Sequence, residues 1–183
     1  ITIIERERNW GLADNIVDGV TQLVNKFGKV IVLEDDLVSS PYFLNYMNDA
    51  LDKYVFDESV MHVSGYMFPI TQSPKLAETF FLMGITSCWG WGTWKRAWDY
   101  FERDAEKWIN IFTPEMLQEY NLNGDYDYWS AMPLNYKGVI KTWACFWHAS
   151  VFYQQGLCLH PKISMIQNIG HDNSGIHSKQ VNF

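Results

Sequence analysis

Cysteine, basic residues and long apolar runs are all scarce in this sequence. Its three cysteines, at positions 88, 145 and 158, show no CxxC spacing, and such an odd, scattered set indicates reduced thiols rather than a disulfide framework. Asp and Glu outnumber Lys and Arg by 21 to 14, for a net charge of −7, which argues against a nucleic-acid-binding surface. No apolar run reaches the length of a transmembrane segment, and no signal peptide is evident. We therefore expect a cytoplasmic protein without nucleic-acid contacts.

The chain also lacks the short motifs of several enzyme classes. It contains no serine nucleophile elbow, Walker A loop or GxGxxG sequence, which weakens hydrolase, kinase and dehydrogenase interpretations. With 183 residues, 48% of them hydrophobic, and no repeat or linker, it is long enough for a single domain, 1–183, with a sizeable core. The chain opens at Ile1 inside a β-rich run, so we expect an upstream part of the domain to be missing.

Aromatic residues, in contrast, are abundant: nine Trp, ten Tyr and eleven Phe. They predict a large aromatic core, and some can also offer stacking surfaces for sugar rings or bases. The stretch SCWGWGTW, residues 87–94, is a candidate, because glycine lets a backbone approach a ligand closely and such a turn can present N–H groups to an anion. We assign Trp89, Gly90 and Trp91 to a ligand site, with simple packing as the alternative, and Trp94 and Trp98 to the core.

One stretch, Lys29–Pro41 (KVIVLEDDLVSSP), organises the rest of the chain. Its apolar run Val30–Leu33 is typical of a strand buried on both faces of a parallel sheet, and Ser-Ser-Pro then predicts a helix start. Glu34, Asp35 and Asp36 would thus lie at the carboxyl end of a central strand, where open α/β sheets bind ligands. Carboxylates suit Mg²⁺ or Mn²⁺, and such a metal usually also holds substrate phosphates. A solvated acidic turn is the alternative.

The flanking segments place this strand in an α/β fold. Ile1–Ile4 reads as a strand, and apolar spacings of three and four predict a helix over residues 12–26, stopped by Gly28. This order predicts a βαβ unit with parallel pairing. Arg6 and Arg8 would then share a sheet edge with the acids, where they could bind a diphosphate or form an ordinary exposed loop. Further helices are expected at 41–54, 93–101, 114–120 and 142–155, and strands or extended segments at 60–64, 80–85, 157–160 and 164–167.

These groups together predict the transfer of a sugar from a nucleotide-sugar donor. The carboxylates would hold a metal that neutralises charge on the leaving diphosphate, and another carboxylate would deprotonate the acceptor hydroxyl. Residues 168–178, rich in Gly, Asn and His, are expected to form a loop that orders around a ligand, with His171 as a candidate active-site residue.

Four stretches in order resemble one known family. VIVLEDDLVSSPYFLNYMNDAL looks like the DxD-containing segment of GT-A-fold glycosyltransferases, and RNWGLADNI, CWGWGTWKRAW and HPKISMIQNIGHDNSGIHS fit the same group. More narrowly, the chain is similar to bacterial sugar transferases related to the Golgi N-acetylglucosaminyltransferase that initiates complex N-glycans. The resemblance implies a Rossmann-type, mostly parallel sheet flanked by helices, and an inverting transfer in polysaccharide biosynthesis. It also implies an earlier strand and helix for the nucleotide base, which we expect to belong to the missing upstream part.

The resemblance further implies a role for each residue of the acidic turn. Asp36 would coordinate Mn²⁺ or Mg²⁺ and through it the diphosphate. Asp35, the second candidate metal ligand, would contact the ribose, and Glu34 would contact the donor side. The Trp-Gly-Trp turn would line the sugar site. The donor would be a nucleotide-sugar, with UDP favoured, and the acceptor a glycan or a lipid-linked glycan, which allows a peripheral position at the inner membrane.

One departure from the family's pattern affects the general base. Relatives carry an acid two residues before the Trp of the late helix, whereas Lys141 stands there in this chain, ahead of Trp143. The other acid-x-Trp sequence is Asp127-Tyr128-Trp129, so we assign Asp127 as the base, with Asp125 in reserve. Two alternatives stay open: a non-catalytic carbohydrate-binding relative, and a metal-dependent nucleotidyltransferase or phosphodiesterase that uses the same acids.

Overall fold

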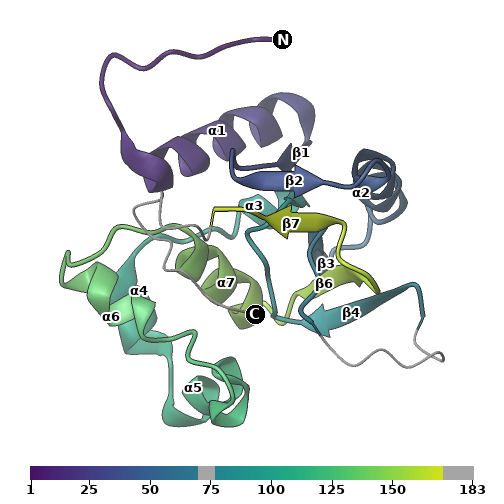
Figure 1. Cartoon of the computed structure of the whole chain (residues 1–183). Helices are drawn as coiled ribbons and strands as arrows, with labels where there is room; N and C mark the ends of the chain where they lie inside the picture. Colours follow the sequence, from purple (N-terminus) through teal and green to yellow (C-terminus); the bar gives the residue numbers. More distant parts are fainter. Residues whose placement is uncertain (70–76, 171–183) are drawn as a thin grey trace.

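A five-stranded mixed sheet forms the centre of the computed structural model, which describes residues 1–69 and 77–170 (Figure 1). The strand order is β1-β5-β3-β6-β4, and a separate antiparallel pair joins β2 to β7. The strands are β1 (Lys29–Val32), β2 (Leu37–Ser39), β3 (Val60–Ser64), β4 (Thr79–Met83), β5 (Trp91–Trp94), β6 (Leu157–Pro161) and β7 (Ile166–Asn168). The helices are α1 (Gly11–Phe27), α2 (Phe43–Lys53), α3 (Lys95–Trp98), α4 (Ala105–Ile111), α5 (Pro114–Tyr120), the 3₁₀ turn η1 (Leu122–Gly124), α6 (Ala131–Tyr136) and α7 (Ala144–Tyr153).

The predicted α/β class is confirmed, but the prediction of a mostly parallel sheet is wrong. β5 runs antiparallel to β1 and β3, and β4 runs antiparallel to β6, so β3 and β6 form the one parallel pair of the described sheet. Ile1–Ile4 is exposed and forms no strand, so the expected βαβ unit does not form. β1 lies at an edge of the described sheet and buries only alternate residues, so it is not a central strand.

β5 lies beside β1, where the sequence predicts a parallel strand, and pairs with it antiparallel. A helix was expected from residue 93, whereas the helix α3 starts at Lys95 and residues 91–94 are extended. Gly92 allows this fit, because a Cβ there would lie 2.9 Å from the Val30 carbonyl oxygen and 3.0 Å from the Met47 side chain. Trp91 and Trp94 then point to opposite faces of the sheet and join different core clusters.

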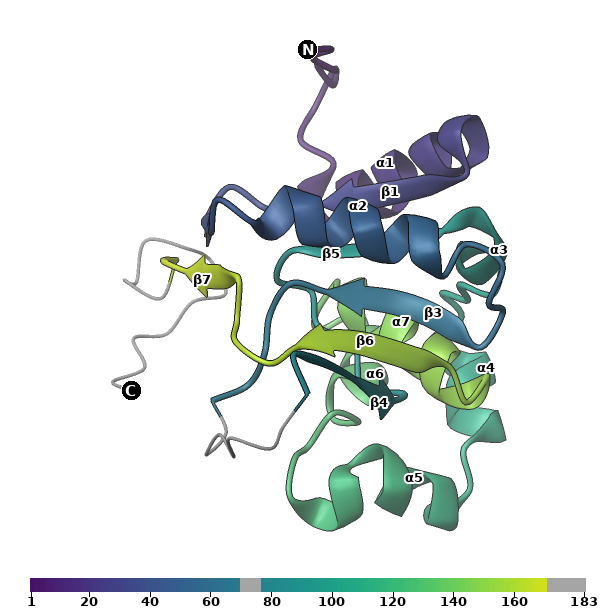
Figure 2. The same ribbon diagram turned by 90° about the vertical axis from the view of Figure 1, so that its right-hand side faces the viewer.

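Helices cover both faces of the sheet (Figure 2). On one face, α1 packs against Val30 and Val32 of β1, and α7 packs through Trp147 against Trp91 of β5. On the other face, α2 packs through Met47 and Leu51 against β5 and β3. The helices α4, α5 and α6 pack beside α7 around a third cluster that includes Trp108, whereas α3 packs with α1. The aromatic residues therefore do form a large core, as their number predicted.

Local signals placed several element ends correctly. α1 ends at Gly28, which has a φ of 79°, as its stop signal predicted. Thr113 caps α5 through its side chain. The start of α2 is two residues later than expected: the Ser40 hydroxyl accepts a hydrogen bond from the Tyr42 N–H, and the helix begins at Phe43. The short helices α4 and α6 were not predicted.

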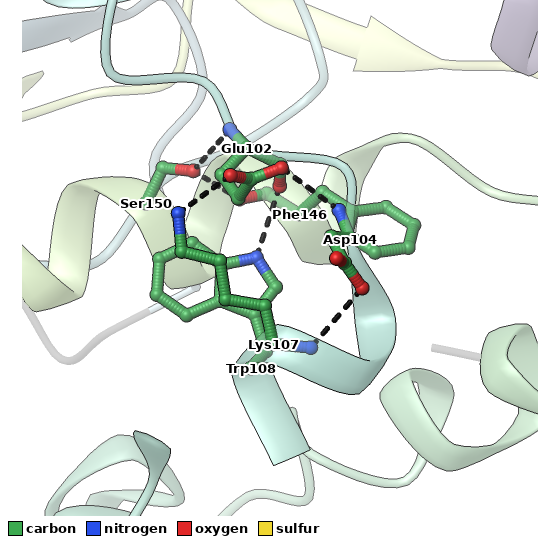
Figure 3. A network of polar contacts seen from close by, with 6 residues as sticks. All are labelled: Glu102, Asp104, Lys107, Trp108, Phe146 and Ser150. Atoms are coloured by element: carbon green, nitrogen blue, oxygen red, sulfur yellow. Dashed lines mark hydrogen bonds and ion pairs between the residues drawn. The ribbon is translucent and has the colours of Figure 1, made fainter. Parts of the chain in front are cut away.

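A polar network ties α4 to α7 (Figure 3). The indole N–H of Trp108 donates to the Glu102 carbonyl oxygen at 2.9 Å, and the Glu102 N–H donates to the Ser150 hydroxyl at 3.1 Å. That hydroxyl in turn donates to the Phe146 carbonyl oxygen, one turn back in α7, at 2.8 Å. Lys107 pairs with the Glu102 carboxylate at 2.7 Å. These contacts fix α4 against the middle of α7.

Candidate functional site

The acidic turn, Glu34–Asp36, directly follows β1. The Leu37 N–H donates to the Glu34 carbonyl oxygen at 3.3 Å, which closes a four-residue turn before β2. β1, β3 and β6 run in the same direction, because β5 is antiparallel to both β1 and β3, and β6 is parallel to β3. The carboxyl ends of these three strands therefore lie on the same side of the sheet, and the acidic turn lies there with them.

The segment around β7 holds Asp36 in place. The Asn168 side chain donates to Asp36 Oδ2 at 3.3 Å, and the Ile169 N–H donates to the Asp36 carbonyl oxygen at 2.9 Å. Gly170 is so close that a Cβ there would lie 2.5 Å from Asp36 Oδ2. Sequence reasoning expected a ligand-binding loop here but missed these supports of Asp36. His171 follows directly and lies outside the described residues.

The three acids differ in exposure. Asp35 is exposed, whereas Glu34 and Asp36 are half-buried. Burial, together with the nearby charges of Asp36 and Asp35, raises the pKa of Glu34 to about 7. The turn therefore concentrates negative charge in a place where part of it is poorly solvated, which a bound cation would relieve.

The register of β5 brings a second segment to the acidic turn. Val32 of β1 faces Trp91 of β5 in an antiparallel pair, so the residues after β1 lie beside those before β5. Cys88 reflects this proximity: burial raises the pKa of its thiol to about 12, with smaller contributions from the charges of Glu34 and Asp36. A thiol in that state is a poor nucleophile at neutral pH.

Cys88 and Trp89 also line a cavity of about 540 Å³, which we call the aromatic cavity. Tyr66, which follows β3, meets Trp89 edge to face with their ring centroids 4.6 Å apart. Aromatic rings with a few polar groups in a concave site favour a flat, hydroxyl-bearing ligand such as a sugar. The cavity is also lined by Phe68, Thr86, Tyr126, Asp127, Tyr128 and His148.

The two candidate bases lie in different cavities. Asp127 lines the aromatic cavity, and its Oδ1 accepts a hydrogen bond from the Ser130 N–H at 3.0 Å. Its other carboxyl oxygen has no hydrogen-bond partner in the described part of the chain. Asp125 instead lines a second cavity, of about 640 Å³, with Met83, Met116, Glu119 and Phe152. The structure thus brings Asp127, and not Asp125, together with Trp89.

Trp91 and Gly90 serve packing, which corrects the prediction that they line a sugar site. Trp91 is 0% exposed, and its ring stacks between His62 and Trp143 at centroid distances of 5.5 and 5.2 Å. Gly90 has a φ of 63°, and a Cβ there would lie 2.6 Å from the Ile166 side chain. Only Trp89 of the Trp-Gly-Trp turn reaches the cavity, because the next residues enter β5.

Arg8 lies in a third cavity, of about 430 Å³, together with Trp10, Asp14 and Lys141. Lys141 forms an ion pair with Asp14 at 2.5 Å, so the lysine at the position of the expected acid binds α1. Neither Arg8 nor Lys141 lines the aromatic cavity. No hydrogen bond or ion pair of the described residues connects Arg8 to the acidic turn, and its predicted diphosphate contact stays a prediction.

Comparison of the chain with protein-family models and with curated proteins found no match.

Proposed function

We propose that this chain is a metal-dependent, inverting glycosyltransferase domain of the GT-A type. It would move a sugar from a nucleotide-sugar, with UDP as the favoured nucleotide, to a hydroxyl of a glycan or lipid-linked acceptor. One observation carries the proposal: the β1–β5 register sets a turn of carboxylates beside a sugar-sized aromatic cavity. Carboxylates suit the metal–diphosphate half of such a donor, and aromatic rings suit its sugar half.

Asp36 and Asp35 have the chemistry to hold Mn²⁺ or Mg²⁺. Both offer hard carboxylate oxygens, and Asp36 is oriented by Asn168. Within residues 1–69 and 77–170, no three His, Cys, Asp or Glu side chains are grouped as a metal site. The proposal does not require such a group, since Mg²⁺ is usually held by one or two carboxylates, waters and substrate phosphates. A bound metal would supply Lewis-acid stabilisation of the leaving diphosphate.

The side chains of the aromatic cavity would do the remaining work. Trp89 and Tyr66, whose rings already touch edge to face, would form one surface for the sugar to pack against, which orients it and excludes water. The unpaired carboxyl oxygen of Asp127 would accept the proton of the acceptor hydroxyl. As that hydroxyl oxygen attacks C1 of the donor sugar, the bond from C1 to the diphosphate breaks, and the configuration at C1 inverts.

Two findings bear on where the reaction would take place. The structure forms no disulfide, and Cys88, Cys145 and Cys158 are all free. No helix in the described part of the chain combines the length and the apolar character needed to cross a membrane. We place the reaction in the cytoplasm, with the protein peripheral to the inner membrane where the acceptor is lipid-linked.

A second candidate function is carbohydrate binding without catalysis. Asp127 is exposed and already stabilises the start of α6 through Ser130, so its carboxylate has a structural task that needs no chemistry. In this case the aromatic cavity would bind a glycan, and neither a metal nor the acidic turn would affect the affinity.

Calorimetric titration of UDP with and without Mn²⁺ tests the proposal. We expect Mn²⁺-dependent binding that Asp36→Asn weakens at least tenfold, since the amide keeps the side-chain volume but lacks the charge. Asp49→Asn, an exposed aspartate on α2, is the matched control and should leave binding unchanged. Binding that ignores both Mn²⁺ and Asp36→Asn would contradict the metal role.

Asp127→Asn separates catalysis from binding. As the general base, Asp127 should be required for transfer from a UDP-sugar and dispensable for UDP binding. We expect its loss to lower kcat by two orders of magnitude or more with little change in UDP affinity. Unchanged transfer would exclude Asp127 as the base, and release of UDP or UMP without transfer would favour the phosphodiesterase alternative.

A further inference from the structure

The second cavity adjoins the aromatic cavity, because two residues line both. Tyr120 and His148 form the shared wall. Along α7, Ala144 and Cys145 line the aromatic cavity, whereas Phe152 and Tyr153, two turns further, line the second one. The loop after η1 passes between the cavities in the opposite direction, since Asp125 lines the second cavity and the next two residues line the aromatic cavity. The two cavities are therefore neighbouring parts of one surface.

His148, in the shared wall, is buried but retains one free polar atom. Its side chain is only 5% exposed, and its ring stacks on Tyr128 with centroids 4.3 Å apart. A 3.1 Å hydrogen bond joins Nδ1 to the Thr86 hydroxyl, whereas Nε2 has no partner in the described chain. Burial lowers the pKa of His148 to about 3, so the ring is neutral at physiological pH. A neutral imidazole keeps a hydrogen-bonding function at each nitrogen, which leaves Nε2 available to a ligand.

The charges of the second cavity restrict its ligand. Among the described residues, the charged ones that line it are the acids Glu119 and Asp125, so an anionic group such as a phosphate would be repelled. Tyr120 and Phe152 offer aromatic surface, and the carboxylates can accept hydrogen bonds from hydroxyl groups. A neutral sugar satisfies all these groups at once.

We propose that the second cavity is a subsite for the second sugar of the acceptor, which is therefore a disaccharide or a longer neutral glycan. This inference rests on the proposed function, in which Asp127 of the aromatic cavity takes the proton of the acceptor hydroxyl. The terminal sugar would lie in the aromatic cavity beside Asp127, and the next sugar in the second cavity. Asp125 and Glu119 would bind its hydroxyls, and His148 Nε2 would bind a hydroxyl near the glycosidic bond. Asp125 thus acquires a binding role in place of the reserve catalytic role.

Paired saccharide titrations test this. The probes are the methyl glycosides of glucose, galactose and N-acetylglucosamine and the disaccharides cellobiose, lactose and chitobiose. We expect at least one disaccharide to bind about tenfold more tightly than its monosaccharide, equivalent to about 1.4 kcal/mol. If no disaccharide of this set gains affinity over its monosaccharide, the inference is overturned.

Methionine-methyl NMR locates the second sugar. Met83 and Met116 line the second cavity and not the aromatic cavity, so their methyl signals should shift with the disaccharide and stay in place with the monosaccharide. Assignment follows from Met83→Leu and Met116→Leu. A gain in affinity without a shift at either methyl group would place the second sugar elsewhere and overturn the inference.

Variants then identify the groups involved. Asparagine at 148 places an amide near the Nδ1 position, and glutamine places one near Nε2. We expect His148→Gln to keep most of the disaccharide affinity and His148→Asn to lose about tenfold, whereas a purely structural role through the Thr86 hydrogen bond would make His148→Asn the better variant. Asp125→Asn, at an exposed position, should weaken disaccharide binding severalfold without affecting the monosaccharide, with Asp49→Asn as its control. This exposed variant keeps the test decisive even if neither His148 variant folds.

Failure of this inference is distinguishable from failure of the proposed function. A chain that binds UDP with Mn²⁺ but shows no disaccharide preference keeps the function and loses the second subsite. A chain that prefers disaccharides but ignores UDP and Mn²⁺ keeps the two subsites as those of a carbohydrate-binding relative.

Discussion

Replacement of Glu34 by glutamine should change how the stability of the protein depends on pH. Glu34 is half-buried beside Asp35 and Asp36, and its pKa rises from an ordinary 4.5 to about 7. Between these values the folded state holds a proton that the unfolded state has released. The free energy of unfolding of the wild type therefore falls as the pH rises from about 4.5 to 7, and the penalty is complete above 7.

The size of the effect follows from that difference. At about 1.36 kcal/mol per pKa unit, a rise from 4.5 to about 7 sets a ceiling of about 3.4 kcal/mol. Glu34 keeps part of its surface in water, and solvent screening reduces this to on the order of 1–2 kcal/mol. Glu34→Gln keeps the side-chain volume and removes the ionisation. The free energy of unfolding of the variant minus that of the wild type should therefore be larger at pH 8 than at pH 5 by about this amount.

Urea denaturation followed by tryptophan fluorescence, in a chelator and at pH 5, 6, 7 and 8, measures this. Glu106→Gln, at an exposed position on α4, controls for the general effect of one fewer negative charge. If the wild-type and Glu34→Gln curves stay parallel from pH 5 to 8, the burial of Glu34 does not strain the acidic turn and the reasoning is refuted.

Two further predictions concern the framework that positions the site. Arg96 donates to the carbonyl oxygens of Tyr54, Val55 and Val60 at 2.8–3.0 Å. Because a lysine cannot reach all three, Arg96→Lys should lower the free energy of unfolding, measured by urea denaturation, by about 2 kcal/mol. A loss below about 0.5 kcal/mol would contradict the role of these three hydrogen bonds. Gly90→Ala should lower the free energy of unfolding by at least about 1–2 kcal/mol, because φ is 63° and the new methyl group would meet Ile166. The control Gly19→Ala, in α1, places its methyl group in open space and should raise the free energy of unfolding by up to about 1 kcal/mol. Equal effects of the two variants would contradict the packing role of Gly90.

Elements with strong local signals were predictable from the sequence. α1 has an amphipathic pattern and a left-handed glycine stop, α5 has a Thr-Pro start, and β3 was predicted with the observed bounds. The start of α4 has a comparable local signal, since the Asp104 side chain caps it by accepting a hydrogen bond from the Lys107 N–H. In each case the determining contacts lie within a few residues of chain.

Elements that depend on distant partners were not predictable in the same way. Ile1–Ile4 has strand-like composition but pairs with no strand of the described residues. Residues 91–94 contain two tryptophans and a glycine, which locally suggest a turn, yet they form β5 because β1 and β3 are available on either side. Within the candidate site, Trp89 could be picked out by composition. The shared wall of Tyr120 and His148 could not, because α5 and α7 meet only in the folded chain.

The register of β5 explains why residues grouped on the assumption of a parallel sheet still lie close together in a mixed one. Inserting an antiparallel strand between β1 and β3 leaves these two strands parallel to each other, so their carboxyl ends share an edge. The same insertion adds the amino end of β5 to that edge, and with it Cys88 and Trp89. A parallel neighbour would have placed its own carboxyl end there instead. The acidic turn and the aromatic cavity adjoin because one strand runs the opposite way, and a shift of the Val32–Trp91 pairing by two residues would separate them by about 7 Å.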